Sequence, residues 1–139
     1  MKQLFHLIIL GLVLTTKVNA HTEMRVQIHN NTDTSCQLID KKIIHGNYST
    51  WQGLSDVLLP QETQAFVIDS SFFYGPHIQL NYRCGENRIA NFKLQQEYAF
   101  YSLSSDSRPQ LTVLEVKELI LTSKFYDNTP GVISISINK

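Results

Sequence analysis

The chain of 139 residues carries 12 basic and 12 acidic side chains, and only 17% of its residues are charged. No block of Lys and Arg occurs anywhere in it, which argues against nucleic acid as a partner, because phosphate binding needs a clustered basic face. The same balance argues against attraction to anionic lipid by charge alone. The length suits one domain with a single hydrophobic core.

Residues 1–20 have the three parts of a secretory signal peptide. Lys2 supplies a positive start, residues 4–14 are almost entirely apolar, and residues 18–20 place small side chains at the cleavage positions. The apolar run is shorter than the about 20 residues that span a bilayer, and no later segment is a better candidate for a membrane anchor. Cleavage would leave 119 residues with 10 basic and 12 acidic side chains, a net charge of −2. We therefore expect a secreted or periplasmic single domain over residues 21–139.

The chain contains two cysteines, Cys36 and Cys84. In an exported protein an even number of cysteines predicts a disulfide. A zinc site is the weaker interpretation, because there is no CxxC motif or Cys/His cluster. A thiol nucleophile would have to stay reduced outside the cytoplasm. Strict alternation over residues 78–84 puts Cys84 on the core face of a strand, which supports the disulfide.

The hydrophobic pattern has the period of β-strands almost throughout. Strands are expected over residues 24–28, 36–44 with an exposed bend at 40–42, 65–69, 78–84, 90–94, 98–103, 111–116 and 133–137. Residues 48–56 are expected to form a loop, and residues 115–122 fit a short helix as well as a strand. Short strands with turn signals every 8 to 12 residues are typical of an antiparallel sandwich or barrel. The predicted fold class is all-β, a single antiparallel β-sandwich or small barrel with one intradomain disulfide.

The stretch SSFFYGPH places three aromatic residues, Phe72, Phe73 and Tyr74, directly before a Gly-Pro pair. Successive side chains of a strand point to opposite faces, so the three cannot all enter one core. The Gly-Pro pair favours a strand end or loop tip, where an exposed aromatic side chain could contact a lipid interface, a sugar ring or a partner protein. The alternative is a buried strand end whose odd aromatic side chain is covered by a loop.

Two further aromatic residues, Tyr48 and Trp51, extend the binding hypothesis. Trp51 is the only tryptophan of the chain, and tryptophan is enriched at binding hot spots. If this loop lies beside the aromatic tip, the side chains form one patch. Otherwise Trp51 closes one end of the core.

Signal cleavage would make His21 the new amino terminus, with an amine and an imidazole available to one metal ion. This position is similar to the first half of the copper site in copper-carrying β-sandwiches and in oxidative polysaccharide-cleaving enzymes. Imidazole suits copper. The remaining ligands would come from His29, His45, His77 and a carboxylate such as Asp69, which form no recognisable motif. A copper-binding β-sandwich is therefore the alternative function.

No nucleophile elbow, HExxH, P-loop or EF-hand spacing occurs in the sequence. An acid-base pair of histidines, as in a secreted ribonuclease, would need a phosphate-binding cation beside it, and Lys41-Lys42 next to His45 is the only candidate. We therefore predict a protein that is not an enzyme and that needs no cofactor.

The order of elements over residues 24–84 resembles that of aegerolysin-like small β-sandwiches. It runs from a strand through an Asn-rich turn, a strand closed by Gly and a Pro-led turn to a strand that ends at Gly-Pro. The resemblance implies a sandwich that binds membrane lipids. A disulfide is not expected in that family, and the resemblance assigns no functional role to any residue of this chain. The expected function is an exported interaction module that contacts a lipid, a glycan or a host protein through its aromatic tip.

Overall fold

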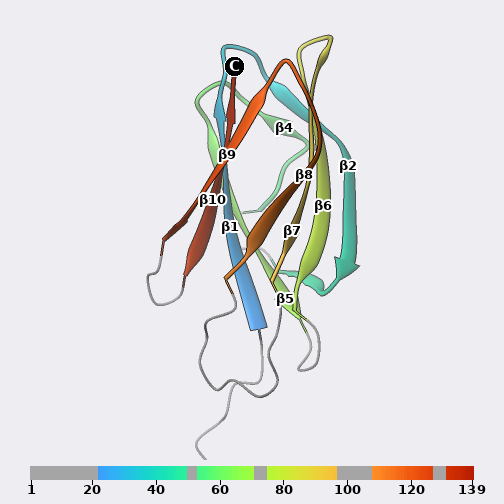
Figure 1. The fold of residues 1–139 in the computed structure, drawn as a ribbon, viewed down its shortest axis with the longest axis vertical. Coiled ribbons are helices and arrows are strands. Elements are labelled where there is room, and N and C mark those ends of the chain that lie inside the picture. The colour runs from blue at the N-terminus through green and yellow to red at the C-terminus, as the bar shows by residue number, and fades with distance from the viewer. Residues whose placement is uncertain (1–21, 50–52, 71–74, 97–107, 127–130) are drawn as a thin grey trace, which may run out of the picture.

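The computed structural model describes residues 22–49, 53–70, 75–96, 108–126 and 131–139 (Figure 1). The regular secondary structure within these ranges consists of β-strands, and no helix long and apolar enough to cross a membrane occurs in them. The strands are β1 Thr22–Asn31, β2 Cys36–His45, β3 Asn47–Ser49, β4 Val57–Leu58, β5 Thr63–Ser70, β6 His77–Cys84, β7 Arg88–Gln95, β8 Gln110–Lys117, β9 Ile120–Tyr126 and β10 Val132–Asn138.

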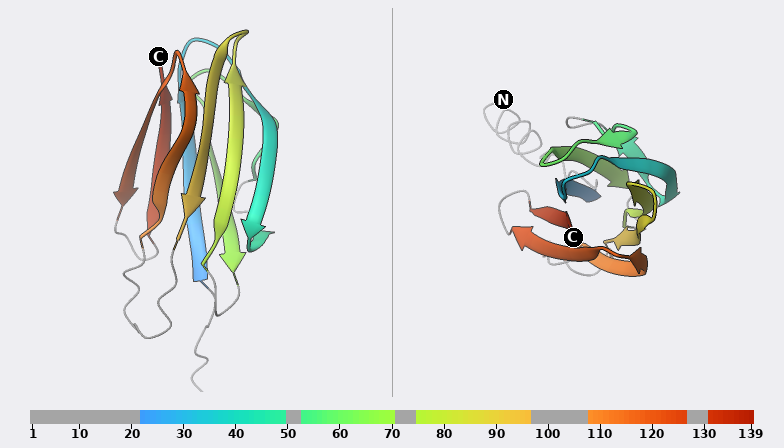
Figure 2. Two further views of the ribbon diagram at one scale, coloured as in Figure 1. Left: turned by 45° about the vertical axis from the view of Figure 1, so that its right-hand side comes forward. Right: turned by 90° about the horizontal axis from the view of Figure 1, so that it is seen from above.

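The strands form two five-stranded sheets that enclose a common core (Figure 2). The first sheet has the order β3-β5-β1-β10-β9, and the second has the order β4-β2-β6-β7-β8. Neighbouring strands are antiparallel except β1 and β10, which are parallel from Arg25 opposite Val132 to Asn31 opposite Asn138. The predicted fold class, a single antiparallel β-sandwich or small barrel, is confirmed as an all-β sandwich of two sheets rich in antiparallel pairs, and the parallel pair β1/β10 is an addition that the prediction did not contain.

Alternating side chains of the central strands fill the space between the sheets. On β6 the side chains of Ile78, Leu80 and Tyr82 are buried, and those between them face outward. The same period holds on β1, β7 and β10, as expected for strands with one face against a core. The largest fully buried side chains are Met24, Ile28, Leu58, Phe66, Ile68, Ile78, Leu80, Tyr82, Phe92, Leu94, Ile135 and Ile137.

The disulfide prediction is confirmed. Cys36 at the start of β2 lies directly opposite Cys84 at the end of β6, with 4.0 Å between the Cα atoms. Both residues are fully buried among the core side chains. The bond therefore joins two neighbouring strands of the second sheet at the end of the core.

Three local expectations need correction. Residues 40–42 are exposed but form no bend, because β2 stays paired with β6 on both sides of register shifts at Leu38/Asp40 and Ile43/His45. The segment 48–56 is not all loop, since β3 pairs with β5. The helix alternative for 115–122 is wrong. β8 ends at Lys117, and Glu118 has a positive φ of 55° in the turn to β9. The strand expected at 98–103 lies outside the described residues.

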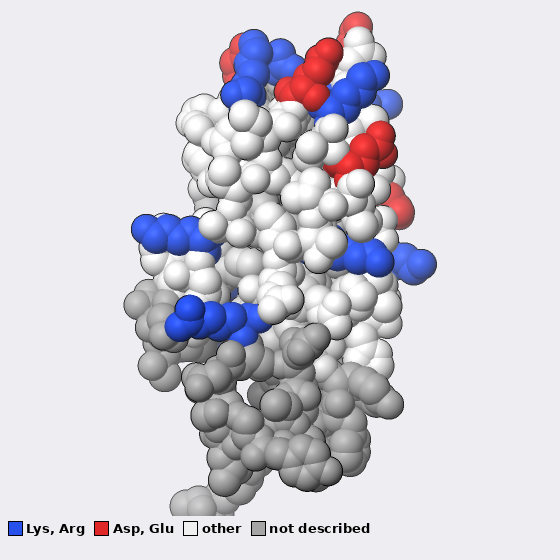
Figure 3. All heavy atoms as spheres, in the orientation of Figure 1, with Lys and Arg blue, Asp and Glu red and all other residues white. Residues whose placement is uncertain are grey.

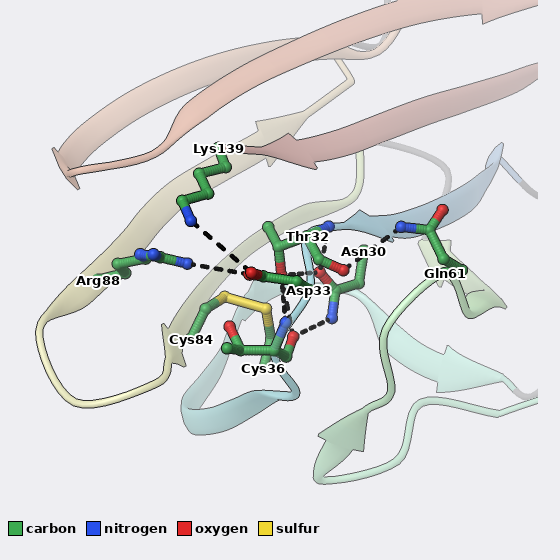
Figure 4. Close-up of polar contacts among 9 residues, drawn as sticks. Asn30, Thr32, Asp33, Cys36, Gln61, Cys84, Arg88 and Lys139 are labelled. Atoms are coloured by element: carbon green, nitrogen blue, oxygen red, sulfur yellow. Dashed lines mark hydrogen bonds and ion pairs between the residues drawn. A yellow bond between two sulfur atoms is a disulfide. The ribbon is translucent and has the colours of Figure 1, made fainter.

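The disulfide end also holds a buried polar network (Figure 4). Asn30 Nδ2 donates to the carbonyl oxygens of Thr34 at 2.8 Å and Leu58 at 3.0 Å. Its Oδ1 accepts from the backbone N–H and the hydroxyl of Thr32, at 3.1 and 2.6 Å. Asn30 is fully buried, so its amide supplies hydrogen-bond partners to polar groups that water cannot reach. These hydrogen bonds hold β1, the turn that follows it and β4 together at the disulfide end of the sandwich.

Asp33 extends the same turn to the surface. Its carboxylate is 3.4 Å from Arg88 Nη1 and 3.7 Å from Lys139 Nζ (Figure 4). A backbone hydrogen bond and then the charge of Lys139 lower the pKa of this exposed carboxyl. Exposed ion pairs of this kind contribute little to stability, so the buried amide of Asn30 dominates the energetics here.

Candidate functional site

The end of the sandwich opposite the disulfide is the candidate site, and we call it the loop end. It is defined by the register pairs Thr22/Ser70, His77/Gln95, Gln95/Gln110 and Tyr126/Val132. The strands that flank residues 71–74, 97–107 and 127–130 all start or stop there (Figure 1). The segment that carries the aromatic tip is therefore attached to the loop end.

Four of the five predicted contact residues, Phe72, Phe73, Tyr74 and Trp51, lie outside the described residues. The fifth, Tyr48, is on β3, is partly buried and packs against the core. Its ring stacks on that of Phe66, with 6.1 Å between the ring centroids. Its hydroxyl oxygen accepts a hydrogen bond from the backbone N–H of Leu54, and Lys41 Nζ lies 5.1 Å from its ring centroid.

The two aromatic segments leave neighbouring strands, β3 and β5, at different points along the first sheet. Ser49, before Trp51, is opposite Val67, whereas Ser70, before the aromatic tip, is the last residue of β5. After Trp51, Gly53 donates its backbone N–H to Ala65 at 3.0 Å. Val67 and Ser70 are three positions apart, so their Cα atoms are separated by about 10 Å along the strand. The Trp51 segment leaves from the end of β3 and the aromatic tip from the end of β5, so the attachment of the Trp51 segment is nearer the middle of the sandwich.

Two histidines meet at the loop end. His45 on β2 lies opposite His77 on β6, although 32 positions separate them in the sequence. Burial first, and then the positive charges of Lys93 and His45, lower the pKa of His77. The Nε2 atom of His77 is buried and has no hydrogen-bond partner. The sequence does not predict that these two histidines are paired, because the alternation of β6 predicts the face of His77 but not its partner strand.

The lowered pKa of His77 predicts a loss of stability in acid. The unfolded chain takes up this proton near the ordinary value of 6.5, and the folded chain takes it up only at lower pH. The contribution of neutral His77 to the free energy of unfolding is therefore fully present above about pH 6.5, and it is lost as the pH drops toward the pKa of His77 in the folded chain. We expect the urea midpoint to fall less between pH 7.5 and 5.5 in His77→Gln than in the wild type.

The matched control for this experiment is His29→Gln, because His29 is near the disulfide end, where its Nδ1 is 2.8 Å from Thr63 Oγ1. An equal acid sensitivity of His77→Gln and the wild type would contradict the role of His77.

The histidines considered for copper are not gathered in one place. His29 is opposite Thr63 near the disulfide end, while His45 and His77 are at the loop end. In the ranges that the structure describes, no group of three or more His, Cys, Asp and Glu side chains could hold a metal ion. His21 lies outside those ranges, so the copper hypothesis stays a prediction.

Charge is unevenly distributed along the long axis. On the face shown in Figure 3, the acidic side chains gather toward the disulfide end, and only basic ones are seen close to the grey region. The described charged residues of the loop-end half are Arg25, Lys41, Lys42, Lys93, Arg108 and Lys124, with Glu23 and Asp69. Three more acidic residues, Glu97, Asp106 and Asp127, lie outside the described residues. The described part of the loop end is thus basic.

The fold has counterparts among solved structures. No protein-family model matches the sequence, and no curated protein matches it. The structure is similar to that of the lipid binding protein Nakanori, with a TM-score of 0.68 and 10% sequence identity over 92% of this chain and 76% of that chain. It is also similar to IP-1A from Alcaligenes faecalis, with a TM-score of 0.57 and 10% identity over 84% and 89%. At this identity the likeness shows a shared fold alone.

Proposed function

We propose that this chain is an exported binding module, not an enzyme, and that its loop end contacts a lipid surface. The observation that carries the proposal is the attachment of the segment with Phe72, Phe73 and Tyr74 to the end of β5 and the start of β6. Lipid is favoured over a glycan or a host protein because one structurally similar protein is a lipid binding protein. Export rests on residues 1–20, and the disulfide is consistent with an oxidising compartment.

The chemistry of the loop end suits the boundary between water and hydrocarbon. Aromatic side chains bury apolar area at the level of the headgroups. Lys side chains can lie along apolar surface while the ammonium stays in water. The described part of the loop end offers this combination, with Lys124 Nζ 5.0 Å from the ring centroid of Tyr126 and Arg108 Cζ 5.5 Å from that of Phe125.

Substitution of the middle aromatic residue tests the proposal. We expect Phe73→Ser to weaken binding to phosphatidylcholine vesicles about tenfold, which corresponds to losing roughly 1.4 kcal/mol of apolar contact. The fraction of protein that floats with the vesicles in a density gradient measures the effect.

The matched control is Leu59→Ser, because Leu59 is 54% exposed and lies at the disulfide end, away from the proposed contact. This variant should float like the wild type. If the wild type does not bind vesicles, or if Phe73→Ser binds as well as the wild type, the proposal is wrong. Binding to a glycan array without binding to vesicles would show that the ligand is a glycan, the second ligand class that the sequence indicates.

A further inference from the structure

The outer face of the second sheet carries a band of basic side chains at the loop end. β2, β6 and β7 lie side by side in this sheet, and the alternation of β6 turns His77 and Gln79 outward (Figure 2). His45 on β2 is opposite His77, while Lys42 on β2 and Lys93 on β7 are opposite Gln79 on its two sides. Residues directly opposite each other share a face of the sheet, so two imidazoles and two ammonium groups gather in two adjacent rows.

These basic groups have no carboxylate close to them in the described part of the sheet. Neither Lys42 nor Lys93 forms an ion pair within the described residues. The nearest described carboxylates on this face, Asp40 and Glu115, are in the next row toward the disulfide end, at its two outer positions. Like charges gathered on one face repel each other, and an anion between them removes the repulsion. The band therefore favours an anionic ligand.

The spacing of the two lysines suits a phosphate group. Lys42 and Lys93 are two strand spacings apart, which is about 10 Å between their Cα atoms. Each ammonium group has three donors and a flexible four-carbon stem, so both can contact one anion above Gln79. Gln79 Nε2 donates to Asn91 Oδ1 at 3.2 Å, which holds the amide between the two lysines in place. A terminal phosphate carries about −1.5 to −2 charges at pH 7 and three acceptor oxygens, which matches two lysines.

His77 links the site to protons. The charged and titratable groups that face it from the neighbouring strands are His45, Lys42 and Lys93, and none of them is a carboxylate. Burial and the positive charges of Lys93 and His45 lower the pKa of His77, and its Nε2 is buried without a hydrogen-bond partner. A negative charge between the lysines opposes those positive charges and favours the imidazolium form. By linkage, protonation of His77 must favour the anion by the same factor.

We infer that a terminal phosphate group binds between Lys42 and Lys93 on the outer face of the second sheet, and that protonation of His77 tightens the binding. The phosphate is that of a lipid headgroup or that of a free ion, and the chemistry of the site is the same for both. The inference does not depend on the aromatic segment, because the site is built from β2, β6 and β7 alone.

Sulfate tests the site without any lipid. It has the shape of phosphate but keeps both charges between pH 5.5 and 7.5, whereas a phosphate group changes its charge near pH 6. We expect sulfate to raise the pKa of His77, measured by NMR of the imidazole against chloride at equal ionic strength. It should also bind about tenfold more tightly at pH 5.5 than at pH 7.5. An unchanged pKa of His77 would overturn the inference, whatever the vesicle experiments show.

Removal of one lysine tests the position of the site. Lys93→Gln should weaken sulfate binding about tenfold at pH 5.5. Because Lys93 lowers the pKa of His77, this variant should also show a higher pKa of His77 in chloride and a smaller response to sulfate. The matched control is Lys117→Gln, which removes a lysine from the same face near the disulfide end, opposite Ile89. The control should bind sulfate like the wild type, and equal effects of the two variants would overturn the inference.

Vesicles identify the source of the phosphate. The wild type, Lys93→Gln and Lys117→Gln are floated at pH 5.5 with phosphatidylcholine vesicles that do or do not contain phosphatidic acid. If phosphatidic acid raises the floating fraction of the wild type and of Lys117→Gln but not of Lys93→Gln, the ligand is a lipid headgroup. If sulfate binds at the site and phosphatidic acid has no such effect, the ligand is a free phosphate ion.

Discussion

Loss of the disulfide between Cys36 and Cys84 is expected to lower the free energy of unfolding by about 4 kcal/mol, because the bond closes a long loop in the unfolded chain. The two cysteines are 48 positions apart in the sequence. The double variant Cys36→Ala/Cys84→Ala removes the crosslink without leaving a free thiol. Urea unfolding under oxidising conditions gives the difference from the wild type.

The reduced wild-type protein separates the crosslink from the side chains. Reduction keeps both sulfur atoms in the core, whereas the alanine variant removes them from two fully buried positions. We expect the reduced protein to lose most of the stability that the double variant loses. A loss below about 1 kcal/mol in both would mean that the unfolded chain is already compact around this loop.

Asn30→Ala is expected to destabilise the fold by about 3 kcal/mol. The substitution leaves the carbonyl oxygen of Leu58 and the backbone N–H of Thr32 without the partners that Asn30 supplies. Each buried polar group that loses its partner costs about 1–3 kcal/mol. Urea unfolding monitored by circular dichroism measures the change.

The neighbouring residue provides the matched control. Asn31 has the same side chain but is exposed, and its amide contacts Asn138 Oδ1 at 2.9 Å on the surface. We expect Asn31→Ala to change the free energy of unfolding by less than about 1 kcal/mol. Equal effects of the two variants would show that solvent can replace the partners of the buried amide.

The loop end could be predicted from the sequence only in part. The Gly-Pro pair places the end of a strand beside Phe72, Phe73 and Tyr74, and the structure ends β5 at Ser70. The pairing of His45 with His77 could not be predicted, because contacts between strands depend on register. Among the described strands β8 has a strand neighbour on one side only, which could not be predicted either, since alternation shows which face of a strand is apolar but not which strands flank it.

The sequence by itself determined the strand period, the disulfide and the all-β class. These follow from local rules, namely alternation along a strand and the pairing of two cysteines in an oxidising compartment. Only the tertiary structure decided the parallel pair β1/β10, the order of strands in each sheet and the four edges. β1 and β10 are about 100 residues apart, and local propensity carries no information about which distant strands share backbone hydrogen bonds. Packing of the whole core settles that choice, because each sheet must bury its apolar face against the other.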